Sequence, residues 1–100
     1  MNVTIHKDKE ITNVIVEGRL DTTTSPDFEK NIASLFTDTE QQIVINCSNL
    51  DFVSSSGLRI LLSLQKQTNA TNCNLKFRNL KPEVKAVFDM TGFSSILTIE

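Results

Sequence analysis

The chain has 100 residues, which suits one domain with a single modest core. Hydrophobic residues make up 39% and charged residues 22% of it, and the formal net charge is -2. This is the composition of an ordinary soluble domain, and it offers no basic surface for nucleic acid. No apolar run approaches the roughly 20 residues of a membrane span, and the first residues do not resemble a secretory signal. We therefore expect one cytoplasmic domain over residues 1–100.

The residues that commonly bind metals are few and scattered. Cys47 and Cys73 lie far apart in the sequence, and His6 is the only histidine. Metal sites need clustered cysteine, histidine or carboxylate ligands, and disulfides are uncommon in the cytoplasm. We expect two free, buried thiols, no metal site and no cofactor.

The N-terminal residues predict a β-hairpin. Hydrophobic and polar residues alternate from Val3 to Ile5, which is typical of a half-buried strand. The polar residues 7–10 supply a turn, and a second strand covers residues 12–17. Gly18 ends this strand before a short polar loop.

A helix is predicted next. Ser25 is a good N-cap, and Pro26 suits the first helical position. The polar residues 37–42 mark the end of this helix. Large apolar residues recur at helical spacing and define its buried face, which comprises Phe28, Ile32, Leu35 and Phe36.

The centre of the chain predicts a buried strand followed by a buried helix. Residues 43–46 are apolar on both faces, as in a central strand covered by helices. A serine-rich turn leads into a helix that extends to about Asn69. Its apolar residues, from Leu58 to Leu64, cover an arc of about 200°, so most of the helix is buried. The exposed stripe of this helix is Arg59, Ser63, Lys66 and Gln67.

The C-terminal part predicts a strand around Leu75 and Phe77, and then a helix that opens at Lys81 and is capped by Gly92. A last strand is expected over residues 94–100. The predicted order is β-β-α-β-α-β-α-β. Strands that alternate with helices indicate an α/β fold, here a mixed central sheet of about five strands with three or more helices.

The turn between the central strand and the central helix is the best candidate for a functional site. It contains Ser54, Ser55 and Ser56, followed by Gly57. The first backbone N–H groups of a helix lack internal partners, so one serine is expected to cap the helix. Another, if exposed, could carry a phosphate, because a helix N-terminus favours negative charge. Gly57 either permits close backbone approach or is a simple loop glycine.

Two motifs resemble the STAS domain, a family named after sulfate transporters and anti-sigma factor antagonists. They are Gly18-Arg19-Leu20-Asp21 and Asp51-Phe52-Val53-Ser54-Ser55-Ser56-Gly57-Leu58-Arg59; residues 91–97 also look like the usual end of the family. The resemblance covers nearly the whole chain and implies that Ser55 is the residue phosphorylated in the family. Ser54 stands where an aspartate is usual, and Asn46 stands where the strand commonly ends in aspartate.

The resemblance implies a phosphorylation-controlled partner switch. In the family, the unmodified protein binds an anti-sigma factor that is also a serine-protein kinase. Phosphorylation releases this partner, and a PP2C-type phosphatase reverses the modification. The partner-binding residues implied for this chain are Asp21, Thr22, Ser54, Ser56, Gly57 and Arg59. Asp21 as a solvated loop residue and Arg59 as a solubilising charge remain alternatives.

Other classes of function have less support from the residues. The nucleophile-elbow pattern Gly-x-Ser-x-Gly requires a glycine where Val53 stands, and His6 has no reason to approach Ser55 as a base. No phosphate-binding loop motif occurs, so nucleotide binding is a minor alternative. We expect no enzyme activity. The main alternative is a non-phosphorylated STAS scaffold or a binding subunit of another complex, such as a lipid-transport assembly.

Overall fold

The computed structural model describes residues 1–33, 42–70 and 73–100. Its centre is a mixed sheet with strand order β1-β2-β3-β4. The first two strands pair antiparallel, and β3 pairs parallel with both β2 and β4. The strand bounds are Asn2–Lys7 for β1, Ile11–Leu20 for β2, Gln42–Val53 for β3 and Asn74–Arg78 for β4.

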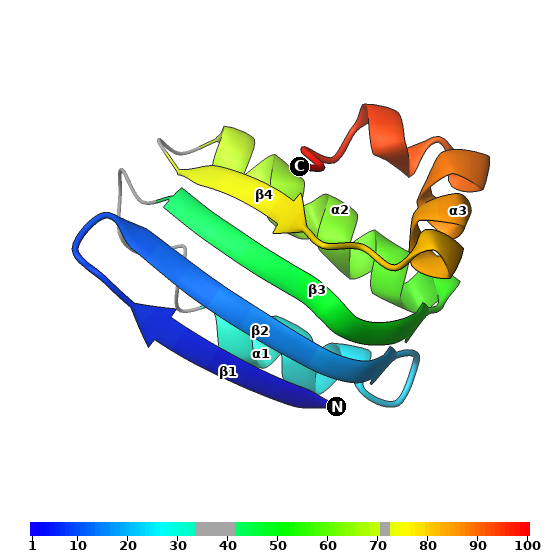
Figure 1. The fold of residues 1–100 in the computed structure, drawn as a ribbon, viewed down its shortest axis with the longest axis horizontal. Coiled ribbons are helices and arrows are strands. Elements are labelled where there is room, and N and C mark those ends of the chain that lie inside the picture. Colours follow the sequence, from blue (N-terminus) through cyan, green and yellow to red (C-terminus); the bar gives the residue numbers. More distant parts are fainter. Residues whose placement is uncertain (34–41, 71–72) are drawn as a thin grey trace.

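Two helices cover one face of this sheet. They are α1, described over Ser25–Ala33, and α2, Ser55–Asn69, and both lie behind the sheet in Figure 1. Each connects two adjacent parallel strands, and the common right-handed sense of such crossovers places both on the same face. The third helix, α3 (Pro82–Thr91), contacts β3 and the C-terminal segment that follows it.

The core fills the space between the sheet and the helices. Side chains of β2, β3 and β4 that point toward the helices are almost completely buried, whereas most of their neighbours on the other face are half-buried or exposed, with Val44 as a buried exception. Phe77 and Phe88 have no exposed surface. The core side chains of α1 and α2 are Phe28, Ile32, Leu58, Leu61 and Leu64. The predicted buried face of the central helix is thus confirmed at Leu58, Leu61 and Leu64, whereas Ile60 and Leu62 at its margins are only partly buried. The four residues predicted to be exposed are exposed.

The strands β2 and β3 are longer than predicted. The second strand continues past Gly18 to Leu20, and the third extends to Val53 instead of ending at Asn46. The pairing of β2 with β3 shifts register between Ile15 and Glu17 and again at Gly18. Such irregularities interrupt the alternation of buried and exposed residues from which strands are predicted. The mid-strand Asn46 accepts hydrogen bonds from the Ser48 N–H and the Asn79 side chain, at 3.1 and 3.3 Å.

The predicted fifth strand is wrong. Phe93–Ser95 form a 3₁₀ helix, and the only pairing of the segment in the described residues is an isolated parallel bridge between Phe77 and Ile99. The Phe77 backbone donates to Thr98 and accepts from Glu100, at 2.9 and 2.8 Å. The described residues therefore contain a sheet of four strands. Gly92 does cap α3, with φ at 81°.

The start of α1 also differs from the prediction. The Ser25 hydroxyl is buried and has no hydrogen-bond partner in the described residues, so it does not cap the helix. The Ser25 N–H itself donates to the Asp21 carbonyl oxygen at 2.8 Å, so helical turns begin in the preceding loop. The predicted helix-face residues Leu35 and Phe36, and most of the predicted helix end, lie outside the described residues.

Both cysteines are buried thiols outside any disulfide, as predicted. Burial raises the pKa of the Cys47 thiol to about 12, which keeps it protonated and unreactive. In the part of the chain that the structure describes, no helix is long and apolar enough to cross a membrane.

Candidate functional site

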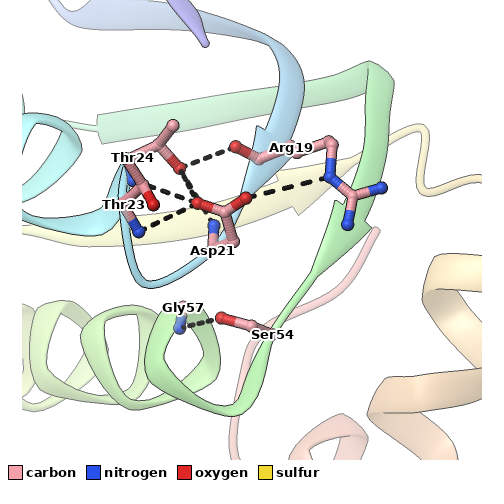
Figure 2. Close-up of polar contacts among 6 residues, drawn as sticks. All are labelled: Arg19, Asp21, Thr23, Thr24, Ser54 and Gly57. Carbon is pink, nitrogen blue, oxygen red and sulfur yellow. Dashed lines mark hydrogen bonds and ion pairs between the residues drawn. The ribbon is translucent and has the colours of Figure 1, made fainter.

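Ser54 joins the end of β3 to the start of α2. Its backbone is extended, with φ at -83° and ψ at 173°, and its hydroxyl accepts a hydrogen bond from the Gly57 N–H at 3.2 Å (Figure 2). Its own N–H donates to the Leu20 carbonyl oxygen at 2.8 Å. The expectation that one of the three serines caps the helix is confirmed, and the capping residue is Ser54.

The other two serines differ in their contacts. The hydroxyls of Ser56 and Thr22 share a hydrogen bond of 3.3 Å, which ties the β2–α1 loop to the first turn of α2. Ser55 is exposed, and its hydroxyl has no partner among the residues that the structure describes. Of the three serines, Ser55 alone presents a hydroxyl that is both accessible and uncommitted.

Replacing Ser54 with alanine should lower the free energy of unfolding by about 1 kcal/mol, because the helix loses its side-chain cap. Chemical denaturation measures this loss. The matched variant Ser55→Ala removes an exposed hydroxyl that makes no hydrogen bond with the described residues, and its free energy of unfolding should stay within about 0.5 kcal/mol of wild type. Equal destabilisation by the two variants would contradict the assignment of the cap to Ser54.

Gly57 lies inside α2 and packs against the end of β2. A Cβ atom at this position would lie 2.8 Å from both the carbonyl oxygen and the Cγ of Leu20. Of the two interpretations of Gly57, close backbone approach is therefore confirmed. The contact holds the first turn of the helix against the strand that leads into the Asp21 loop.

Asp21 organises the loop between β2 and α1. Its Oδ1 accepts from the N–H groups of Thr23 and Thr24 at 3.0 and 3.1 Å, as Figure 2 shows. The Thr24 hydroxyl accepts from the Asp21 N–H at 2.9 Å and donates to the Arg19 carbonyl oxygen at 2.7 Å. These bonds make Asp21 a structural element of the loop, and the same loop carries Thr22 to the serine turn.

The hydrogen bond from the Thr24 backbone is the main cause of a lowered pKa for Asp21, and the bond from Thr23 and the nearby Arg19 act in the same direction. Arg19 Nε lies 3.8 Å from Asp21 Oδ2. The ionised carboxylate is thus the form that the folded loop prefers.

Because its pKa is lower in the folded protein, Asp21 stabilises the fold at pH values above its unfolded pKa, and this stabilisation is lost as pH falls through the folded pKa. The stability of the Asp21→Asn variant should therefore decline less than that of wild type between about pH 5 and pH 2. Thermal unfolding across this range, with the exposed Asp27→Asn variant as control, measures the difference. Parallel curves for wild type and Asp21→Asn would contradict this role.

Phe52 belongs to the same surface, although it is not among the site residues predicted from the sequence. The Arg19 guanidinium lies 4.2 Å from the centroid of the Phe52 ring, and the two residues are register partners across β2 and β3. Both side chains are partly exposed, at 62% for Arg19 and 38% for Phe52. The contact follows from the pairing of Arg19 with Phe52 across the two strands. It cannot be predicted if β3 is assumed to end at Asn46.

His6 lies at the other end of the sheet from the serine turn. It pairs with Asn13, which pairs with Val44 near the start of β3, whereas Ser54 follows the end of that strand. At about 3.3 Å per residue, this separation is roughly 30 Å. His6 is therefore not positioned to activate Ser55. Within residues 1–33, 42–70 and 73–100, no group of three or more histidine, cysteine or acidic residues could hold a metal ion.

The remaining predicted site residue, Arg59, is exposed on α2. The structure thus places Ser54, Ser56, Gly57 and Thr22 in one cluster, with the Asp21 loop on one side and Ser55 and Arg59 on the exposed face of the helix. The cluster offers an ordered hydroxyl-rich surface.

Comparison with known proteins gives consistent results. The family model for the STAS domain matches residues 2–100. A protein of Bordetella bronchiseptica named as an anti-sigma factor antagonist, BtrV, is 29% identical over 99 residues, which cover 99% of this chain and 85% of the relative.

The chain also resembles two solved structures of the anti-sigma factor antagonist SpoIIAA. The unphosphorylated form has a TM-score of 0.80 at 20% identity, with 99% of this chain and 88% of the other covered. The phosphorylated form, from Bacillus, has a TM-score of 0.74 at 19% identity, with 99% and 91% covered. These two likenesses concern the fold.

Proposed function

Because the chain belongs to the STAS domain family, we propose that it acts as an anti-sigma factor antagonist in a phosphorylation-controlled partner switch. The unmodified protein binds an anti-sigma factor that is also a serine-protein kinase, in the cytoplasm. Phosphorylation of Ser55 by this partner ends the complex, and a PP2C-type phosphatase restores the binding form. The name of the Bordetella relative supports this class of function.

The observation that carries the proposal is that the three serine hydroxyls differ in their contacts. Ser54 caps α2 and Ser56 bonds to Thr22, so a phosphate on either would replace a structural contact. Ser55 is exposed, and no hydrogen bond within the described residues engages its hydroxyl. A kinase can reach this hydroxyl without unfolding the turn.

A phosphate on Ser55 would act locally. It adds about -1.5 to -2 charges at pH 7, and the beginning of a helix tolerates negative charge. The fold should therefore persist in the modified protein. A partner docked over Ser55 and the neighbouring β2–α1 loop would instead meet a bulky anion. The phosphate therefore acts by excluding the partner.

The serine at position 54, where the family usually has aspartate, is compatible with this switch. Serine and aspartate are both preferred N-cap residues, and Ser54 performs the cap here. The substitution therefore preserves the turn while removing one negative charge beside Ser55. The change should therefore affect which kinase recognises the turn, and it should have little effect on the shape of the turn.

Mass spectrometry of the protein isolated from its own cells tests the proposal, with phosphatase treatment as control. We expect one phosphoserine, at Ser55, whose occupancy varies with growth and stress. A pull-down with wild type and Ser55→Ala should recover a kinase-fold anti-sigma factor with both. Absence of phosphoserine under all conditions, together with recovery of transporter subunits, would favour the non-phosphorylated scaffold instead.

A further inference from the structure

We infer that Arg59 is the intramolecular partner of a phosphate on Ser55. The inference rests on the proposed function, because it concerns the modified state of that site. It assigns to Arg59 a specific change of contacts on phosphorylation. In the unmodified form its guanidinium has no ion pair or hydrogen bond with the described residues, and in the modified form it pairs with the phosphate.

The spacing on α2 brings the two residues together. Ser55 is the first residue of the helix and Arg59 lies four residues later, so their side chains are neighbours on one face, with about 5–6 Å between Cβ atoms. Both are exposed, whereas Leu58, at the alternative spacing of three, is buried. Long helical side chains lean toward the helix N-terminus, so Arg59 covers the turn that contains Ser55.

The surrounding charges leave this role to Arg59. Arg19, at the end of β2, lies beside Asp21, and Lys81, before α3, pairs with Asp51 of β3. These two cations therefore already have carboxylate neighbours. The guanidinium of Arg59 has no ion-pair or hydrogen-bond partner among the residues that the structure describes, and the side chain is exposed.

Arginine is chemically suited to this contact. Its planar guanidinium can donate two parallel hydrogen bonds to phosphate oxygens, and an anion placed N-terminal to a cation at this spacing has the favourable orientation on a helix. The modification then has two effects on the surface. It adds an anion at position 55, and it engages the cation at position 59 that an acidic group of the partner could otherwise contact.

The test installs phosphoserine at position 55 during translation, so that no kinase is needed. Titration by ³¹P NMR then measures the second ionisation of the phosphate. Pairing with Arg59 favours the dianion. The second ionisation constant should therefore be about twofold larger in wild type than in Arg59→Gln, so that the phosphate pKa is about 0.3 lower in wild type. The Arg59 Nε–H signal should titrate with the same midpoint as the phosphate.

The control is Lys66→Gln, which removes one positive charge from the exposed stripe of the same helix, about three turns beyond Ser55. It should leave the phosphate pKa within 0.1 of wild type, and Arg59→Lys should retain part of the shift. Equal pKa values in wild type and Arg59→Gln, or an equal shift in Lys66→Gln, would overturn the inference. These results do not depend on whether Ser55 is phosphorylated in cells, so they are distinguishable from failure of the proposed function.

Discussion

Replacing Gly57 with alanine should destabilise the protein, although alanine is the better helix former. A Cβ atom would lie 2.8 Å from the Leu20 carbonyl oxygen, and this oxygen is already fixed by the Ser54 N–H. Overpacking of this kind costs about 1–3 kcal/mol, whereas the gain in helix propensity is at most about 1 kcal/mol. We expect a net loss of up to about 2 kcal/mol in the free energy of unfolding. Each kcal/mol lost should lower Tm by roughly 4–8 °C.

The matched control is Ser63→Ala, on the exposed face of the same helix. It gains helix propensity without meeting a neighbour, so it should raise stability by a few tenths of a kcal/mol. Shortening Leu20 to alanine should relieve part of the clash, so the Leu20→Ala and Gly57→Ala effects should be less than additive in a double-mutant cycle. Stabilisation by Gly57→Ala to the level of Ser63→Ala would contradict the close contact.

The close contact matters for function because it sets the position of the serine turn. If α2 moves away from β2, the hydrogen bond between Ser56 and Thr22 is lost and the loop no longer adjoins the helix. We therefore expect Gly57→Ala to weaken partner binding as well as stability. The same glycine thus links the packing of the strand end to the shape of the candidate interface.

The central helix could be predicted from the sequence because a single physical signal dominates it. The apolar arc from Leu58 to Leu64 repeats at helical spacing, and the serines before it are typical of a helix start. Which serine caps could not be predicted, because each of the three has the same hydroxyl. Ser54 was selected by tertiary contacts, through the bond of its N–H to Leu20.

The strands were harder to predict because their sequences contain conflicting signals. In β3, buried residues after Cys47 recur every third position, at Leu50 and Val53, so the alternation that marks a strand is absent. At the C-terminus, Leu97 is buried and Ile99 partly so, as in a strand, yet among the described residues only the Phe77 backbone pairs with the backbone of this segment. Burial alone therefore suggested a strand where backbone pairing is confined to one residue.

The largest functional effect is expected from Ser55→Asp. A fixed negative charge at this exposed position mimics part of the phosphate and should weaken binding to the kinase-type anti-sigma factor. Regulatory coupling typically spans about 5- to 150-fold in affinity, and one carboxylate should fall toward the lower end. Ser55→Ala removes the hydroxyl without adding charge, so it should bind within about twofold of wild type. Isothermal titration calorimetry with the purified partner measures both affinities.

Ser63→Asp is the matched charge control, since Ser63 is exposed on α2 two turns beyond Ser55. It should alter affinity far less than Ser55→Asp, because its distance of about 12 Å exceeds the Debye length at physiological ionic strength. The circular dichroism spectrum of Ser55→Asp should match that of wild type, since a helix N-terminus accommodates the charge. Unchanged affinity in Ser55→Asp, or equal losses in Ser55→Asp and Ser63→Asp, would rule out local exclusion at Ser55. A loss confined to Ser55→Asp in a folded protein would instead locate the switch at the one serine whose hydroxyl the turn leaves free.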